Sequence, residues 1–150
     1  MTADITVRRL RAGDREAWQR LWDQYLRFYR AELAPGTSDT TFARLCEPDG
    51  DLVGLVAVDP QDRALGLAHL VFHPSTWTES SYCYLEDLFV DPASRGSGVA
   101  NRLIDALYAN ARERGAGRVY WTTQQFNGAA RSLYDTVARL TSFVIYEHDL

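Results

Sequence analysis

The sequence predicts a mixed α/β domain with one β-sheet flanked by helices, and three observations lead to this prediction. Apolar residues alternate or run continuously over six segments of strand length, and they recur at helical spacing over four longer segments. These segments follow one another in the order βααβββαβαβ. The 150 residues are 46% hydrophobic and 24% charged, without a repeat or low-complexity tract, so we expect residues 1–150 to form a single domain.

The first half of the chain predicts a strand, two helices and then a run of strands. The turn-type residues Asp59-Pro60-Gln61-Asp62 separate two apolar runs and indicate an antiparallel hairpin. Pro35-Gly36 ends the first helix, and a short second helix lies between Thr37 and Pro48. The expected ranges are a strand at 5–8, a helix from 14 to about 33, and strands at 52–58, 65–72 and 82–90.

The second half predicts a central helix and a shorter one, each followed by a strand. Apolar residues recur every four positions in the central helix, and Gly115 and Gly117 end it. Asn127 is expected to cap a helix that continues to about Arg139. The central helix carries Val99, Leu103, Leu107 and Ala111, and the strands are expected at 119–122 and at 143–146.

The charge composition excludes several classes of protein. The net charge is -4, and all 16 basic residues are arginines, so a P-loop, a kinase site and a Schiff-base lysine are absent.

The acidic balance argues against nucleic-acid binding. Because the sequence has neither a membrane-spanning apolar run nor a signal segment, we expect a cytoplasmic protein with no membrane partner. Three histidines and two cysteines form no metal signature, so we expect no metal and no disulfide between Cys46 and Cys83.

A glycine-containing loop, Arg95-Gly96-Ser97-Gly98, leads from the strand at 82–90 directly into the central helix. Glycines let the backbone approach a ligand closely, and the free amides of a first helical turn attract anions. For Gly96 and Gly98 alone, a plain turn between strand and helix would be the better interpretation, but the flanking residues favour a cradle for pyrophosphate.

The loop and its flanks resemble those of the GCN5-related N-acetyltransferase (GNAT) family. An arginine, two residues, Gly98, one residue and Ala100 match the loop motif of that family, and the order of elements agrees. The segment 84–90 is similar to the spermidine/spermine N-acetyltransferases, whereas the segments 120–134 and 143–146 are similar to the yeast histone/polyamine and D-amino-acid N-acetyltransferases. The resemblance implies a mixed sheet of six to seven strands with about four helices, and acetyl transfer from acetyl-CoA, the cosubstrate, to an amine.

Two residues are the catalytic candidates implied by this resemblance. An alkylammonium must lose its proton before it attacks a thioester, and Glu86 stands where polyamine acetyltransferases carry a glutamate that acts through water. Its alternative roles are an exposed strand carboxylate or a substrate contact. Tyr134 matches the family tyrosine that protonates the leaving thiolate, and its alternative role is a core aromatic residue.

The expected cofactor site combines backbone and side-chain groups. Backbone groups of the strand that ends at Val90 would stabilise the oxyanion and pair with the pantetheine arm. Arg95 and Arg102 are placed to add positive charge beside the phosphates. The predicted contacts with coenzyme A are Leu88, Phe89, Val90, Arg95, Gly96, Ser97, Gly98, Val99, Ala100, Asn101, Asn127, Ala130 and Tyr134.

The acceptor site is expected between the first helix and the strand at 119–122. Its predicted lining residues are Phe28, Tyr29, Glu86, Tyr120 and Trp121. Trp77, Tyr82 and Tyr84 add aromatic surface that either encloses a cation or fills the core, and we expect at least half of them in the core. Tyr29 stands where polyamine enzymes carry an acid, which disfavours a long polyamine.

Three functions remain open from the sequence. The first is an N-acetyltransferase for the primary amine of a small molecule, an amino acid, short amine or polyamine, acting by direct attack in a ternary complex. The second is an acetyltransferase for protein lysines or N-termini, and the third is a noncatalytic acyl-CoA sensor. Because only one strand follows the last helix, where many relatives have two, the open sheet edge predicts a homodimer.

Overall fold

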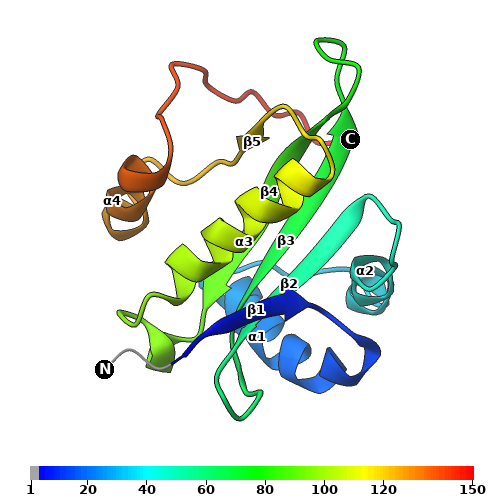
Figure 1. Cartoon of the computed structure of the whole chain (residues 1–150), viewed down its shortest axis with the longest axis vertical. Helices are drawn as coiled ribbons and strands as arrows, with labels where there is room; N and C mark the ends of the chain where they lie inside the picture. Colours follow the sequence, from blue (N-terminus) through cyan, green and yellow to red (C-terminus); the bar gives the residue numbers. More distant parts are fainter. Residues whose placement is uncertain (1–3) are drawn as a thin grey trace.

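A five-stranded sheet in the order β1-β2-β3-β4-β5 forms the centre of the computed structural model, which describes residues 4–150 (Figure 1). The pairs β1–β2, β2–β3 and β3–β4 are antiparallel, and β5 pairs with β4 in parallel. The strands are β1 (Thr6–Arg9), β2 (Leu52–Val58), β3 (Ala64–Pro74), β4 (Ser81–Val90) and β5 (Val119–Tyr120). The α-helices are α1 (Arg15–Phe28), α2 (Thr37–Leu45), α3 (Val99–Glu113) and α4 (Gly128–Val137).

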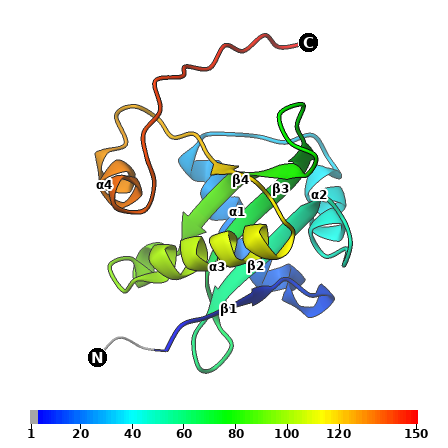
Figure 2. The same ribbon diagram turned by 45° about the horizontal axis from the view of Figure 1, so that its top comes forward.

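Two hydrophobic layers cover the two faces of this sheet. On one face, all four residues predicted for the buried side of α3 are buried against β2, β3 and β4, which confirms the four-residue periodicity. On the other face, Trp18, Leu21 and Trp22 of α1 pack with α2 against the same strands. Figure 2 shows α3 and α1 on opposite sides of the sheet. The predicted hairpin at 59–62 is also present, because β2 and β3 are antiparallel.

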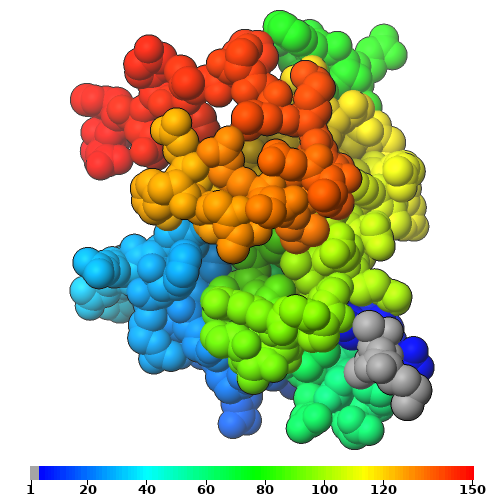
Figure 3. Space-filling view, turned by 90° about the vertical axis from the view of Figure 1, so that its left-hand side faces the viewer, coloured from blue at the N-terminus to red at the C-terminus, as the bar shows by residue number. Residues whose placement is uncertain are grey.

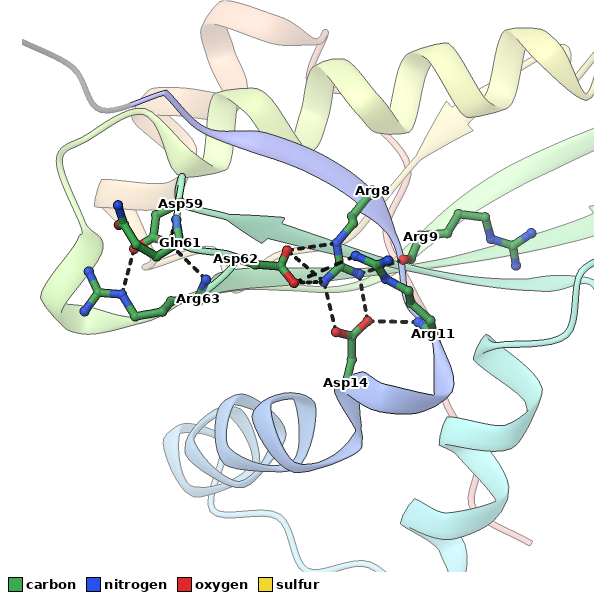
Figure 4. A network of polar contacts seen from close by, with 8 residues as sticks. All are labelled: Arg8, Arg9, Arg11, Asp14, Asp59, Gln61, Asp62 and Arg63. Carbon is green, nitrogen blue, oxygen red and sulfur yellow. Dashed lines mark hydrogen bonds and ion pairs between the residues drawn. The ribbon is translucent and has the colours of Figure 1, made fainter.

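A polar network fixes β1 to the elements at its ends (Figure 4). The Arg8 guanidinium donates hydrogen bonds to both carboxylate oxygens of Asp14, at 2.8 and 3.0 Å, and contacts Asp62 in the β2–β3 turn. Asp14 also accepts a hydrogen bond from the Arg11 amide at 2.9 Å. The Arg8 guanidinium holds the pKa of Asp14 below its usual value against the opposing effect of burial. This network joins the first strand, the short 3-10 helix (Ala12–Asp14) and the hairpin.

The structure corrects the prediction at several element ends. Residues 143–146 do not form a strand, so the sheet has five strands instead of six to seven. A strand requires a partner for its backbone groups, and this segment contacts none within the described chain. The strand predicted at 119–122 has only the residues Val119–Tyr120, and α1 ends at Phe28 instead of about 33.

Candidate active site

A β-bulge in β4 positions the first site residue, Glu86. His69 of β3 pairs with Asp87, and the next residue, Leu70, pairs with Leu85, so Glu86 has no partner across the ladder. Leu85 packs in the layer beneath α3, whereas Asp87 contacts His69 on the α1 side. The extra residue therefore interrupts the usual alternation and places Glu86 and Asp87 together on the face that carries α1.

A chain of buried hydrogen bonds lies directly behind this bulge. The Trp18 indole can only donate, so its bond to His69 Nε2 at 3.0 Å makes that nitrogen the acceptor. His69 Nδ1 consequently carries the proton and donates to Asp87 Oδ2 at 2.8 Å. Tyr25 of α1 lies beside this carboxylate, and its pKa is raised mainly by burial and then by Asp87. These contacts tie α1, β3 and the bulge of β4 into one unit.

The electrostatic surroundings of Glu86 keep it protonated at a higher pH than an ordinary glutamate. Its side chain is exposed, yet the surrounding protein removes part of its hydration. This loss of solvation raises the pKa most, and the Asp87 carboxylate raises it further. A carboxylate with a raised pKa is a stronger base than an isolated one.

Aromatic side chains gather around the bulge from β4, β5 and α1. The rings of Tyr84 and Tyr120 lie 4.8 Å apart, and the Tyr120 hydroxyl is 2.7 Å from His73 Nε2. Burial, Tyr84 and Glu86 together raise the pKa of Tyr120. At the end of α1, the ring centroids of Tyr29 and Tyr25 lie 5.0 Å apart, and Tyr29 extends the aromatic surface. None of Trp77, Tyr82 and Tyr84 is buried, so the expectation that at least half of them belong to the core is wrong.

Helix α4 carries Tyr134 toward the same region. The side chain of Asn127 accepts a hydrogen bond from the Ala130 amide at 3.4 Å, which confirms the predicted cap. The Tyr134 ring lies 5.3 Å from Trp121 in a T-shaped arrangement, and Tyr29 is close enough to affect its pKa. Burial is the main cause that raises the pKa of Tyr134, so its hydroxyl stays protonated at neutral pH and above.

The loop before α3 has the geometry of an anion cradle. Gly96 and Gly98 have φ values of 82° and 84°, which favour glycine, and an added Cβ at either would meet nothing within 4 Å. Gly98 caps α3 without a side-chain hydrogen bond, so the amides of the first turn, from Val99 onward, have no side-chain cap. Ser97 donates to the Ser94 carbonyl at 2.5 Å and holds the loop closed.

The edge of β4 that faces β5 is open over the residues between the bulge and this loop. Only Cys83 and Tyr84 pair with β5, so the backbone from Leu85 to Val90 has no strand partner on that side. Leu88, Phe89 and Val90 lie in this stretch, and Phe89 is buried against α1. Figure 3 shows a recess where α4 (orange), the start of α3 (light green) and the end of α1 (blue) meet.

The predicted site residues come from the end of α1, from β4 and β5, from the loop before α3 and from α4, and several of them are exposed. Phe28 is 59% exposed at the end of α1, and Asn101 is exposed on α3. Arg95 is exposed at the loop, with its guanidinium 5.8 Å from the Phe89 ring centroid. The sequence reasoning missed His69, Asp87 and Tyr25, because their contact depends on the strand register and on the bulge.

Within residues 4–150 no group of three or more metal-binding side chains occurs, and no helix is long and apolar enough to cross a membrane. A hollow of about 730 Å³ lies away from the recess, at the opposite end of α3, where Arg114, His73 and Asp51 line it.

Comparison with known proteins identifies the family. A model of the acetyltransferase (GNAT) family matches residues 6–137. The chain belongs to the GNAT acetyltransferase family. It is 36% identical to a D-amino-acid N-acetyltransferase of Saccharomyces cerevisiae over 97% of this chain and 91% of that protein. It is also 34% identical to a thialysine N-epsilon-acetyltransferase of Caenorhabditis elegans, over 56% of this chain and 51% of the relative.

A solved structure supports the fold of this acetyltransferase. The structure of AAC(6')-Iy in complex with a bisubstrate analogue, CoA-S-monomethyl-acetylneamine, superimposes with a TM-score of 0.83 at 20% identity. The superposition covers 99% of both chains. The superposition confirms the predicted fold, and the family match together with the named relatives confirms the predicted acyltransferase activity. Membership of this family supports acetyl-CoA as the cosubstrate.

Proposed function

We propose that this acetyltransferase transfers the acetyl group of acetyl-CoA to the primary amine of a small molecule, by direct attack in a ternary complex. The observation that carries the proposal is the β4 bulge, which presents Glu86 beside the aromatic surface of Tyr84 and Tyr120. Tyr134 reaches the same recess from α4. A base and an acid thus flank the end of β4.

Coenzyme A would bind along the open edge of β4 and across the start of α3. The phosphates would accept hydrogen bonds from the backbone between Gly96 and Ala100, with Arg95 adding positive charge. The unpaired backbone from Leu88 to Val90 would pair with the pantetheine arm as an added strand does. Asn127 and Ala130, at the start of α4, would contact the same arm.

The chemistry divides between Glu86 and Tyr134. Glu86 would accept a proton from the ammonium group of the acceptor, directly or through one water, which leaves a free amine. The amine nitrogen then forms a bond to the thioester carbonyl carbon, and a backbone amide of β4 stabilises the negative oxygen. When the carbon–sulfur bond breaks, the Tyr134 hydroxyl donates its proton to the sulfur. The nitrogen then loses its extra proton, which restores the Tyr134 hydroxyl directly or through water, and the products are an N-acetyl amine and coenzyme A.

The surroundings of Glu86 favour a small cationic acceptor. The neighbouring carboxylates Glu86 and Asp87 attract a cation, and the aromatic faces of Tyr84 and Tyr120 bind its apolar part or the cation itself. The relatives named for D-amino acids and for thialysine act on small amines, which supports the same acceptor class here. We also propose a homodimer as the assembly, because β5 has an open edge and the C-terminal residues have no partner.

The test is turnover of acetyl-CoA with a panel of acceptors, followed by release of the free thiol and by mass spectrometry of the products. The panel contains D- and L-amino acids, short amines, polyamines, and lysine-containing peptides with free N-termini. We expect thiol release matched by an acetylated small amine, with initial-velocity lines that intersect. Acetylation of peptides alone would favour a protein acetyltransferase, and tight binding of coenzyme A without turnover would favour a sensor.

A further inference from the structure

A group of buried polar side chains behind the bulge takes no part in the chemistry described so far. Trp18 is 1% and His69 3% exposed, and the side chain of Asp87 is 13% exposed. Burial of a carboxylate is costly, and an apolar residue at position 87 would avoid that cost. The carboxylate nevertheless stands directly after the proposed base, Glu86, which points to a role in its action.

The hydrogen bonds fix the charge on the two inner members of this group. The Trp18 indole occupies His69 Nε2, and His69 Nδ1 donates to Asp87, so the imidazole carries one ring proton and no net charge. Within residues 4–150, this imidazole is the partner that lies within ion-pair distance of Asp87, and no arginine does. The bulge therefore keeps a carboxylate beside Glu86 whose charge no cation neutralises.

The same hydrogen bonds hold the backbone where Glu86 leaves the ladder. His69 pairs with Asp87 and Leu70 with Leu85, so Glu86 is the extra residue of the bulge. A bulged residue has no place in the regular ladder that would set its direction. The side chain of Asp87, bonded to His69 and through it to Trp18 of α1, supplies a fixed point one residue away.

We propose that His69 and Asp87 are positioning residues of the acetyl transfer: anchored by Trp18, they hold the bulge so that Glu86 faces the recess, and they keep a negative charge beside it. Both act through Glu86. The inference rests on the proposed function, because it concerns the base of that reaction. It assigns a purpose to the buried polar chain beyond the stability of the core.

Four titratable groups face Glu86 from the elements packed around it. They are Asp87 of β4, His69 of β3, Tyr25 of α1 and Tyr120 of β5. Burial raises the pKa of both tyrosines, so they are uncharged at pH 7, and the imidazole is neutral by its hydrogen bonds. Asp87 is therefore the charged neighbour, and it raises the pKa of Glu86. Removal of that charge makes Glu86 a weaker base and moves the acid limb of kcat/KM to lower pH.

The first experiment requires no turnover. NMR of the ¹⁵N-labelled ring reports the tautomer of His69 at pH 7, and the ¹³C carboxyl signal of Glu86, assigned by its loss in Glu86→Gln, is titrated in the wild type and in Asp87→Asn. Asparagine has nearly the size of aspartate and still accepts the bond from His69, so this variant removes the charge alone.

We expect the neutral ring with its proton on Nδ1, and a lower titration midpoint of Glu86 in Asp87→Asn. Asp105→Asn, exposed on α3, is the matched control and leaves the midpoint unchanged. A ring with its proton on Nε2, a doubly protonated ring, or equal midpoints in Asp87→Asn and the wild type would overturn the proposal.

The second experiment measures kcat and KM with acetyl-CoA and the most active amine of the acceptor panel. His69→Leu fills the space without a donor or acceptor, and we expect it to lower kcat about ten- to a hundredfold, as misplacement of a catalytic group does. His69→Gln, with one donor and one acceptor, is expected to recover most of the loss, and KM for acetyl-CoA stays nearly unchanged in both variants. Circular dichroism and urea denaturation establish that each variant is folded under the assay conditions.

A role in stability alone leaves kcat of the folded variants unchanged, so full kcat in His69→Leu, or equal losses in His69→Leu and His69→Gln, would overturn the positioning role. Where His69→Leu does not fold, Asp87→Asn decides: we expect its acid limb at lower pH than that of the wild type, and an unmoved limb would contradict the proposal. A wild-type protein without turnover on any amine would overturn the proposed function. Wild-type turnover with unaltered kcat and pH profile in these variants would overturn this inference and leave the function standing.

Discussion

Replacement of His69 by alanine is expected to lower the free energy of unfolding by about 4 kcal/mol. The imidazole is 3% exposed, accepts the Trp18 indole proton and donates to Asp87. Loss of the bond to a carboxylate costs about 1.5–3 kcal/mol, and a buried indole N–H without an acceptor costs about 1–3 kcal/mol. The smaller side chain leaves a cavity, which adds to this cost.

The measurement is urea denaturation of the wild type and of two variants at this position. With a slope of about 2 kcal/mol per molar urea, the loss in His69→Ala corresponds to a midpoint lowered by about 2 M. In His69→Gln the amide keeps one donor and one acceptor, as the neutral imidazole does, so about half of the loss is expected to be recovered.

His148→Ala, in the exposed C-terminal segment, is the matched control and should change stability by less than about 0.5 kcal/mol. Equal losses of stability in His69→Ala and His69→Gln, or a loss under about 1 kcal/mol in His69→Ala, would refute the hydrogen-bond chain behind the bulge. If His69 made no such hydrogen bonds, the glutamine amide would recover none of the lost stability.

Two further substitutions test the acid of the site and the polar network of β1. Tyr134→Phe is expected to lower kcat about a hundredfold with little change in the affinity for coenzyme A, because a general acid contributes at least that much. Tyr82→Phe, with a hydroxyl outside the recess, is the control. An undiminished kcat in Tyr134→Phe would exclude Tyr134 as the general acid. Asp14→Asn is expected to cost about 2 kcal/mol at pH 7, the range of a hydrogen bond to a charged group. The folded protein lowers the pKa of Asp14, so its contribution is present above the unfolded value of about 3.9 and is lost as the pH falls through the folded pKa. Urea midpoints of the two proteins should therefore converge under strong acid, and a constant difference down to pH 2 would contradict the assignment.

Periodic signals predicted the elements whose partners lie within the same chain. The four-residue spacing from Val99 to Ala111 requires one buried helix face, and the sheet beneath supplies the other side. The loop at 95–98 was recognisable because glycines at positive φ, directly before a helix, leave a distinctive pattern in the sequence. The same local character made Asn127 recognisable as a cap.

Features that depend on register or on a second partner were not predictable in this way. Glu86 and Asp87 share a face only because a bulge interrupts the alternation of β4, and one inserted residue has no sequence signature of its own. The contact of His69 with Asp87 follows from that register. Residues 143–146 have the composition of a strand, but composition does not specify whether the pairing edge belongs to the same chain.

Deprotonation of the acceptor amine at Glu86 is tested most directly by the pH dependence of kcat/KM in the wild type and in Glu86→Gln. Burial and Asp87 raise the pKa of Glu86, so the carboxylate loses its basic form, and the enzyme its activity, as the pH falls through a midpoint above the ordinary value of about 4.3. We expect Glu86→Gln to lower kcat/KM about a hundredfold and to abolish this limb, whereas Glu79→Gln, on the exposed β3–β4 loop, keeps the wild-type profile. A Glu86→Gln enzyme with the size and the pH profile of the wild-type kcat/KM would contradict a base at this position.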